Sequence, residues 1–187
     1  LNCDINVTGF LDTKDPLSTM AALNQIGASI NKDGDLVKIK KRSRPFNSPE
    51  SSIYLGNSGT GIRLMTGLIS GLNLKATLIG DKSLSQRPML RVVNPLVKMG
   101  KKISTNDGKT PIKIQGGSIS DNFDYKMPVA SAQVKSSLIL ASLSSGNSIH
   151  IEEPKVTRDH TEKMIEHCGG KIDVQNSSEG KIITLNN

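Results

Sequence analysis

The chain has 187 residues, of which 35% are hydrophobic, 22% charged and only 3% aromatic, and its formal net charge is +7. This balance favours a globular protein of one large or two small domains, and no apolar run reaches the ~18 residues that a membrane-spanning helix needs. The positive charge favours an anionic partner, whereas the scarcity of aromatic residues disfavours a surface that stacks nucleic-acid bases.

Cysteine and histidine usage gives no sign of a metal site. Cys3 and Cys168 lie far apart and have no metal-ligand spacing, so we expect reduced thiols in a cytoplasmic protein. His150, His160 and His167 form no metal motif either. The N-terminus shows no secretory signal, and because it has no initiating Met and starts within a pattern, we expect a fragment of a longer protein.

The first part of the chain predicts one helix between a strand and a hairpin. β-Branched alternation predicts a strand over residues 1–11. A helix follows, with Asp15 as its N-cap and Gly27 at its C-terminal end. Strands over residues 28–31 and 36–40 then form a hairpin.

The middle of the chain predicts two helices among four strands. After a loop over 42–52, the pattern predicts a strand over 53–56, a glycine-rich turn over 56–61, a helix over 62–70 and a strand over 74–79. The next helix opens at Arg87-Pro88, and its apolar stripe is Leu90, Val93, Leu96 and Val97. A hairpin of strands 102–105 and 111–114 follows.

The last part predicts the same order of elements. It begins with a strand over 123–129, followed by a helix over 132–144 and a strand over 148–152. The residues of this helix that we expect to face inward are Val134, Leu138, Ile139 and Ala141. Asp159 then caps a second helix and forms a capping box with Glu162, and a hairpin of strands 171–174 and 181–185 ends the pattern.

An internal repeat underlies this order. Gly27, Gly100 and Gly169 each end a helix before a similar hairpin, at intervals of 73 and 69 residues. We therefore expect an α+β fold of repeated βαβαββ units, with parallel helices inside and sheets outside. The expected division is a single domain over 1–187, made of a partial first repeat 1–45, a second repeat 52–116 and a third repeat 120–187.

Parallel packing of related helices would bring their N-termini to one end of the molecule. Helix N-termini carry unpaired N–H groups and a partial positive charge, which suit phosphate or carboxylate groups. The residues at these strand-to-helix turns, which we expect to form one electropositive surface, are Ser58-Gly59, Arg87, Ser131–Gln133 and Arg158.

Four motifs at these turns resemble the 5-enolpyruvylshikimate-3-phosphate synthases, especially the bacterial class with SAQVKS and TRDHTE. In order, they are GNSGTGIRL at 56–64, GDKSLSQRPM at 80–89, MPVASAQVKSSLILA at 127–141 and EPKVTRDHTEKM at 153–164. The resemblance covers essentially the whole chain and implies the N-terminal lobe of a two-lobed enolpyruvyl transferase, with the active site between the lobes.

The resemblance also implies an activity. The family transfers the enolpyruvyl group of phosphoenolpyruvate to the 5-hydroxyl of shikimate 3-phosphate, a step of chorismate and aromatic amino acid biosynthesis, and needs no metal or organic cofactor. It implies two anionic substrates and the missing C-terminal lobe as partners, and neither nucleic acid nor membrane.

Carried over to this chain, the motifs imply two sets of binding residues. Shikimate 3-phosphate would contact Ser131, Ala132, Gln133 and Arg158; phosphoenolpyruvate would contact Asn57, Gly59, Arg87 and Gln133. A larger residue in place of the glycine restricts glyphosate in this family, so Gly59 implies a glyphosate-accepting pocket. Arg63 is expected to be structural and is left out of the site.

Two family features have no counterpart in the chain. The Lys-Ser…Arg motif near the family's N-terminus is absent, and the acidic residues assigned to proton transfer belong to the other lobe. We therefore assign no catalytic residue, and we interpret His160 and Glu162 as cap and helix-face residues. The chain is expected to bind substrate in half a site and to be inactive alone.

Three other interpretations remain open at this point. A UDP-N-acetylglucosamine enolpyruvyl transferase would need a reactive loop cysteine, and neither Cys3 nor Cys168 lies in such a loop. An RNA 3′-terminal phosphate cyclase-like protein shares similar repeats, and its binding would fall steeply with salt. The third is a binding module, either another phosphorylated-ligand binding module of the same repeat fold or a plain binding or scaffold module, which a failure to bind any phosphorylated metabolite would support.

Overall fold

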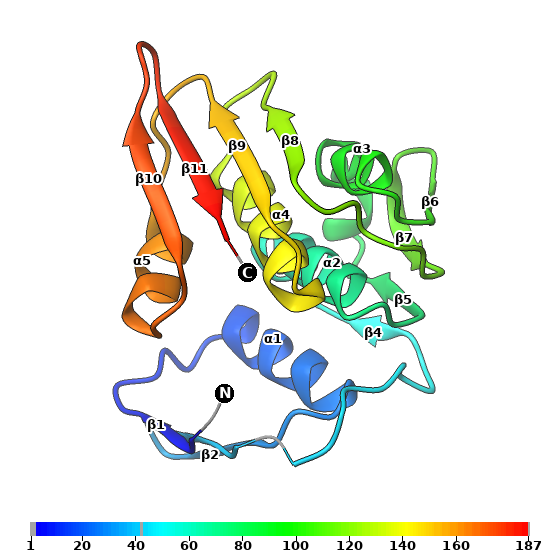
Figure 1. Ribbon diagram of the computed structural model, residues 1–187. Helices are drawn as coiled ribbons and strands as arrows, with labels where there is room; N and C mark the ends of the chain where they lie inside the picture. Colours follow the sequence, from blue (N-terminus) through cyan, green and yellow to red (C-terminus); the bar gives the residue numbers. More distant parts are fainter. Residues whose placement is uncertain (1–2, 42, 187) are drawn as a thin grey trace.

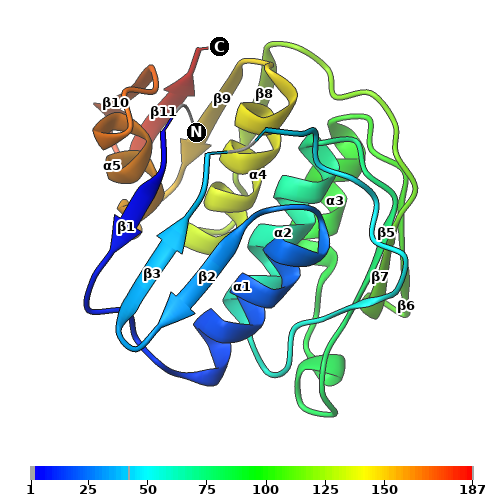
Figure 2. The same ribbon diagram turned by 90° about the horizontal axis from the view of Figure 1, so that it is seen from below.

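Three small β-sheets lie around a central group of helices in the computed structural model, which describes residues 3–41 and 43–186 (Figure 1). The view from below shows α2 and α4 side by side between the sheets (Figure 2). This is the α+β arrangement that the repeated pattern predicts. The first two residues of the predicted strand over 1–11 and the first residue of the predicted loop over 42–52 lie outside the described part.

The first sheet is antiparallel and has the strand order β1-β3-β2. One helix, α1, follows its first strand. The bounds are β1 Ile5–Val7, α1 Lys14–Gln25, β2 Ile30–Asp33 and β3 Leu36–Ile39. The predicted strand over 1–11 is thus longer than the three residues that pair with β3.

The second sheet has the order β4-β5-β7-β6, with β4 parallel to β5 because α2 carries the chain back between them. The bounds are β4 Ile53–Tyr54, α2 Gly59–Gly71, β5 Ala76–Ile79, the 3₁₀-helix η1 Leu84–Gln86, α3 Leu90–Lys98, β6 Ile103–Asn106 and β7 Lys109–Ile114.

The third sheet repeats the second, with the order β10-β11-β9-β8 and a parallel pair β8–β9 joined through α4. The bounds are β8 Phe123–Lys126, α4 Ala132–Ser145, β9 Ile149–Glu153, α5 His160–His167, β10 Ile172–Asn176 and β11 Lys181–Leu185.

The three repeated glycines end their helices in the same way. Gly27, Gly100 and Gly169 have φ values of +102°, +105° and +81°, which a residue with a Cβ rarely adopts. In each case the glycine N–H and the following N–H bond back to helix carbonyls, as in a Schellman motif. The prediction that these glycines end helices is confirmed.

The two central helices, α2 and α4, touch through small residues. A Cβ added at Gly67 would overlap the Ser137 carbonyl, and one at Gly71 would overlap the Ala141 carbonyl. The Ser137 hydroxyl also donates a 2.9 Å hydrogen bond to the carbonyl oxygen of Arg63. Because successive contacts advance along both helices together, α2 and α4 run parallel and their N-termini lie at the same end.

The buried core runs through these two helices and the sheets that flank them. Its central residues are fully buried and include Ile62 and Ile69 of α2 and Leu138 and Ile139 of α4. The predicted inward residues of α4 are all buried, as expected. No helix of the described residues has the length and apolarity needed to cross a membrane.

Three helix starts differ from the prediction, and that of α3 lies at Leu90 instead of Arg87-Pro88. The N-cap of α1 is Thr13, which has an extended backbone, so Asp15 lies inside the first turn. There its charge still suits the positive end of the helix dipole. Helix α2 begins at Gly59, before the predicted residue 62, because the Ser58 hydroxyl accepts a 3.1 Å hydrogen bond from the Gly61 N–H.

Two predicted helix faces also need correction. In α3, Leu90 and Val97 are 45% and 46% exposed, because the helix starts at residue 90 and turns Val92 and Leu96 into the core. At α5, Asp159 occupies the N-cap position but accepts no capping hydrogen bond. Glu162 does not form the predicted capping box, because its side chain points inward to a buried lysine.

Candidate functional site

The N-termini of α2 and α4 lie side by side and are joined by one side chain, that of Gln133. Its Nε2 donates a 2.8 Å hydrogen bond to the Thr60 hydroxyl. Its Oε1 accepts a 3.0 Å hydrogen bond from Arg63 Nη1. Gln133 is the second residue of α4, so one predicted binding residue of the third repeat is bonded directly to the glycine-rich turn of the second.

Arg63 lies at the centre of this arrangement. Besides Gln133, its guanidinium donates to the carbonyl oxygens of Gly59 at 3.0 Å and Pro88 at 3.2 Å. Burial, followed by the nearby charges of Arg87 and Arg91, lowers the pKa of Arg63. An arginine nevertheless stays protonated in proteins, so the neighbouring positive charges remain and favour an anion beside them.

Arg63 was expected to be structural and outside the site. Its guanidinium nevertheless lies beside Gly59 and Gln133, two of the predicted site residues. The sequence places Arg63 one helical turn after Gly59 but does not show its contacts with Gln133 and Pro88, which lie far along the chain. Thr60, whose hydroxyl is the partner of Gln133, was not predicted because the helix was expected to begin only at residue 62.

Gly59 lets two guanidinium groups approach the start of α2. A Cβ at this position would lie 2.7 Å from Arg87 Nη1 and 3.2 Å from Arg63 Nη1. Arg87 follows η1 in an extended conformation, and its Nη2 donates to the Asn57 side chain. The structure thus brings together three of the four residues expected to contact phosphoenolpyruvate, namely Asn57, Gly59 and Arg87. The fourth, Gln133, is joined to them through Arg63.

A small cavity of about 140 Å³ lies on the other side of Gln133. It is lined by Ala132, Gln133 and Arg158 from the predicted set, and by Thr60, Leu64, Ser136, His160 and Thr161. The Arg158 side chain is exposed at its rim. Of the residues expected to contact shikimate 3-phosphate, Ser131 is the one that does not line this cavity; its hydroxyl accepts a 3.4 Å capping hydrogen bond from the Val134 N–H.

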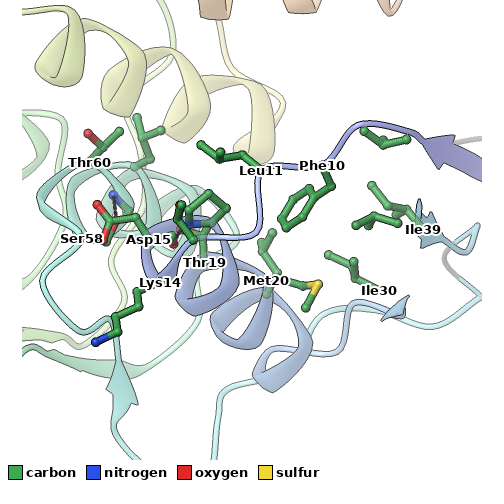
Figure 3. A pocket seen from close by; sticks show the side chains of 17 residues that line it. Phe10, Leu11, Lys14, Asp15, Thr19, Met20, Ile30, Ile39, Ser58 and Thr60 are labelled. Carbon is green, nitrogen blue, oxygen red and sulfur yellow. Dashed lines mark hydrogen bonds between the residues drawn. The ribbon is translucent and has the colours of Figure 1, made fainter. Parts of the chain in front are cut away.

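A larger hollow of about 840 Å³ adjoins the cavity. Figure 3 shows its mostly apolar lining, with Phe10, Met20, Ile30 and Ile39 near one end and Ser58 and Thr60 near the other. None of the predicted binding residues lines it. Its apolar character does not suit a phosphorylated ligand, so we place the candidate site at the helix N-termini.

The described residues contain no group of three or more His, Cys, Asp or Glu side chains that could hold a metal ion. His160 lines the small cavity, whereas Glu162 is 3% exposed and faces away from it. The two therefore do not form an acid–base pair. What the site offers is positive charge, amide groups and two helix N-termini, which bind and orient anions.

Comparison with known proteins agrees with the motif resemblance. The family model of EPSP synthase (3-phosphoshikimate 1-carboxyvinyltransferase) matches residues 2–185. The chain is 46% identical over 169 residues to the 3-phosphoshikimate 1-carboxyvinyltransferase of Ruthia magnifica subsp. Calyptogena magnifica, covering 90% of this chain and 39% of that protein. It is 41% identical over 187 residues to that of Shouchella clausii, covering 98% of this chain and 42% of that protein.

A solved structure of EPSP synthase from Acinetobacter baumannii superimposes with a TM-score of 0.89 at 38% identity, covering 99% of this chain and 42% of the other. The fold class expected from the sequence is thereby confirmed. The chain spans about 40% of the length of the curated relatives that it matches.

Proposed function

Because the chain belongs to the EPSP synthase family, we propose that it forms one half of a site that transfers the enolpyruvyl group of phosphoenolpyruvate to the 5-hydroxyl of shikimate 3-phosphate. The other half would come from a C-terminal lobe. The proposal places the reaction in the cytoplasm, in chorismate and aromatic amino acid biosynthesis, with neither a cofactor nor nucleic acid.

The observation that carries this proposal is the convergence of Arg63, Arg87 and Gln133 on the first turn of α2. Guanidinium groups bind phosphate and carboxylate through paired hydrogen bonds, and both proposed substrates carry such groups. Helix N-termini add N–H donors on the same side. These features support a positively charged site that would bind the negatively charged substrates.

Gln133 divides the proposed site into two parts. Shikimate 3-phosphate would occupy the side of Ser131, Ala132 and Arg158, with Gln133 shared. Phosphoenolpyruvate would occupy the side of Asn57, Gly59 and Arg87, to which we add Arg63. With this arrangement, the two substrates would lie next to each other on either side of the Gln133 side-chain amide, as a transfer between them requires.

Gly59 would also determine which analogues of phosphoenolpyruvate fit. We propose that its missing Cβ leaves room for glyphosate in the intact enzyme, because a Cβ here would already approach Arg87 at 2.7 Å. A larger side chain would displace that guanidinium and reduce the space beside it.

A titration of shikimate 3-phosphate, followed by backbone amide shifts in NMR spectra, tests the proposed half-site. We expect shifts at Ser131, Gln133 and Arg158, and no comparable shifts with shikimate, which lacks the phosphate. Arg158→Ala should weaken binding about ten-fold or more, since it removes a charge-assisted contact. Lys155→Ala removes an exposed charge from the same loop and should change affinity little. Equal losses in both variants would contradict a specific role for Arg158.

Turnover is expected to be absent from the chain alone. No group within it is assigned to the proton transfers of the reaction, and general acid–base catalysis requires such a group within hydrogen-bond reach. The measurement is phosphate release from phosphoenolpyruvate in the presence of shikimate 3-phosphate. A rate above that of a heat-denatured sample would contradict the half-site proposal.

A further inference from the structure

Three charged side chains are buried together beneath the loop that carries Arg158. Lys135 Nζ lies 3.1 Å from Glu153 Oε2 and 2.6 Å from Glu162 Oε1. The side chains of Lys135 and Glu153 are 0% exposed and that of Glu162 is 4% exposed. They come from α4, the end of β9 and the first turn of α5, so the cluster joins three elements at one point.

Stability alone gives a poor account of this cluster. Removing charges from water costs free energy that an ion pair often does not recover. One positive charge here faces two negative charges, and neither Glu162 oxygen accepts a hydrogen bond of ordinary geometry from the described residues. What the cluster does provide is a fixed relation between α4, β9 and α5.

The cluster continues directly into the loop. The Glu153 carboxylate accepts a 2.7 Å hydrogen bond from the Thr157 hydroxyl and a 3.3 Å hydrogen bond from the Thr157 N–H. Thr157 immediately precedes Arg158. A second link, 2.6 Å between the hydroxyl oxygens of Ser136 and Thr161, holds α4 to α5 just beyond the loop.

Nothing comparable holds Arg158 itself. Its side chain is exposed, and within residues 3–41 and 43–186 no hydrogen bond or ion pair involves its guanidinium. Its direction therefore depends on the loop backbone, and the loop backbone depends on Thr157 and Glu153. Lys135 lies only two residues after Gln133. The first turn of α4 therefore carries both Gln133, which lines the cavity opposite Arg158, and Lys135, which is linked through Glu153 to the loop of Arg158.

We propose that Lys135, Glu153 and Thr157 are positioning residues that hold Arg158 at the cavity shared with Gln133. Lys135 orients the Glu153 carboxylate, the carboxylate holds Thr157, and Thr157 sets the backbone from which Arg158 reaches the ligand. The proposal rests on the proposed function in one respect, namely that the ligand is shikimate 3-phosphate.

The test is a double-mutant cycle in this chain, read by the affinity for shikimate 3-phosphate. Thr157→Val keeps the branched shape and removes the hydroxyl, so affinity should fall about three- to ten-fold. In the Arg158→Ala background the same substitution should change affinity less than two-fold, because the residue it positions is gone. Thr157→Ser retains the hydroxyl and should restore wild-type affinity. An equal loss in both backgrounds, or no loss in either, would overturn the proposal.

A measurement without ligand separates this proposal from the proposed function. Heteronuclear NOE values for amides 155–159 should fall in Thr157→Val and not in Thr157→Ser. If the wild-type chain does not bind shikimate 3-phosphate, the proposed half-site affinity fails, and the loop measurement still decides whether Thr157 orders the loop. Unchanged NOE values in Thr157→Val would overturn the positioning role. Thermal melts of each variant identify any that fail to fold.

Discussion

Gly59 controls how closely Arg87 and Arg63 can lie to the first turn of α2. A side chain there would meet the ends of two flexible guanidinium groups, at 2.7 and 3.2 Å, rather than backbone atoms. The neighbours can therefore move, and the fold does not require glycine at this helical position. Glycine at this position instead lets the positive charges of Arg87 and Arg63 lie close to the start of α2.

Gly59→Ala should consequently separate binding from stability. Gly59 is the first residue of α2, where helix propensity matters little, and the atoms that a Cβ would crowd are the flexible ends of Arg87 and Arg63, so the free energy of unfolding should change by less than about 1 kcal/mol. Affinity for phosphoenolpyruvate should fall about ten-fold, because Arg87 is displaced. Urea unfolding and an NMR titration measure the two quantities. A loss of stability above about 2 kcal/mol with unchanged affinity would show that the glycine serves the fold.

The buried cluster around Lys135 yields a prediction about stability. Lys135→Met leaves two buried carboxylates without their cation and should lower the free energy of unfolding by about 3–5 kcal/mol. Glu162→Gln leaves one positive and one negative charge and should change it by less than about 1 kcal/mol. Chemical denaturation of both variants measures the difference, and similar losses in the two would refute this charge balance.

The site residues predicted at the turns before helices remain predictions as ligand contacts, but the structure brings several of them together. Gly59, Arg87, Gln133 and Arg158 all lie around the two adjoining parts of the site. Arg63 was considered and left out as structural, because the sequence does not show its contacts with Gln133 and Pro88. Lys135 could not be placed, because a lysine on a helix is usually exposed and the sequence does not show that Glu153 and Glu162, from the following strand and helix, turn inward to it.

At the scale of elements, the close contact between α2 and α4 depends on small residues. Gly67 and Gly71 are one helical turn apart and face carbonyl groups of α4. Close approach of this kind needs small residues, and serine hydroxyls supply hydrogen bonds across it, such as the one from Ser137 to the Arg63 carbonyl. The relative position of the two helices follows from this contact.

Gly67→Ala should destabilise the chain despite the higher helix propensity of alanine. The added Cβ would overlap the Ser137 carbonyl, so the helices must move apart, at a cost of about 3 kcal/mol. Ser70→Ala is the matched control on the same helix. The buried Ser70 hydroxyl has no hydrogen-bond partner among the described residues, so its removal should raise stability by about 1 kcal/mol. Thermal unfolding distinguishes these opposite signs, and equal losses would contradict the packing argument.

The order of helices and strands was predictable because glycine ends each outer helix and hairpin turns follow. The errors lie at the starts of α1, α2 and α3, on the exposed face of α3 and at the expected capping box of α5. Thr13 is the N-cap of α1, and Asp15 lies within the helix. Both residue types are suitable N-caps, so the backbone conformation, which the sequence does not show, decides between them. Glu162 was expected at a cap because spacing in sequence carries no information about a lysine on another helix.

At the scale of the whole molecule, two large hollows lie next to the first unit. Its sheet and α1 border the hollow of about 840 Å³, and a second hollow of about 760 Å³ lies between β1 and α5. Leu11 is 66% exposed beside the first and Met164 is 63% exposed beside the second. Continuous apolar surface of this kind marks a place where other polypeptide or solute binds.

The chain should therefore bind the dye ANS in its folded state. Fluorescence should fall by about half in Leu11→Thr, which makes the wall of the first hollow polar. Val174→Thr is the control, because Val174 is 37% exposed on β10 and lines neither hollow. Equal changes in the two variants would indicate dye bound elsewhere, and sedimentation at increasing concentration would show whether the same surface associates.

The glycine contact between the two central helices has a consequence for selectivity. Because Gly67 and Gly71 pack directly against α4 carbonyl groups, side-chain rotamers have little influence on the distance between the two helices. In the proposed site, the two substrates must therefore fit a spacing of the helix N-termini that is set when the chain folds. Binding would then order few backbone groups, so little conformational entropy would be lost, and discrimination would depend on the size of the substrates as well as on their charge.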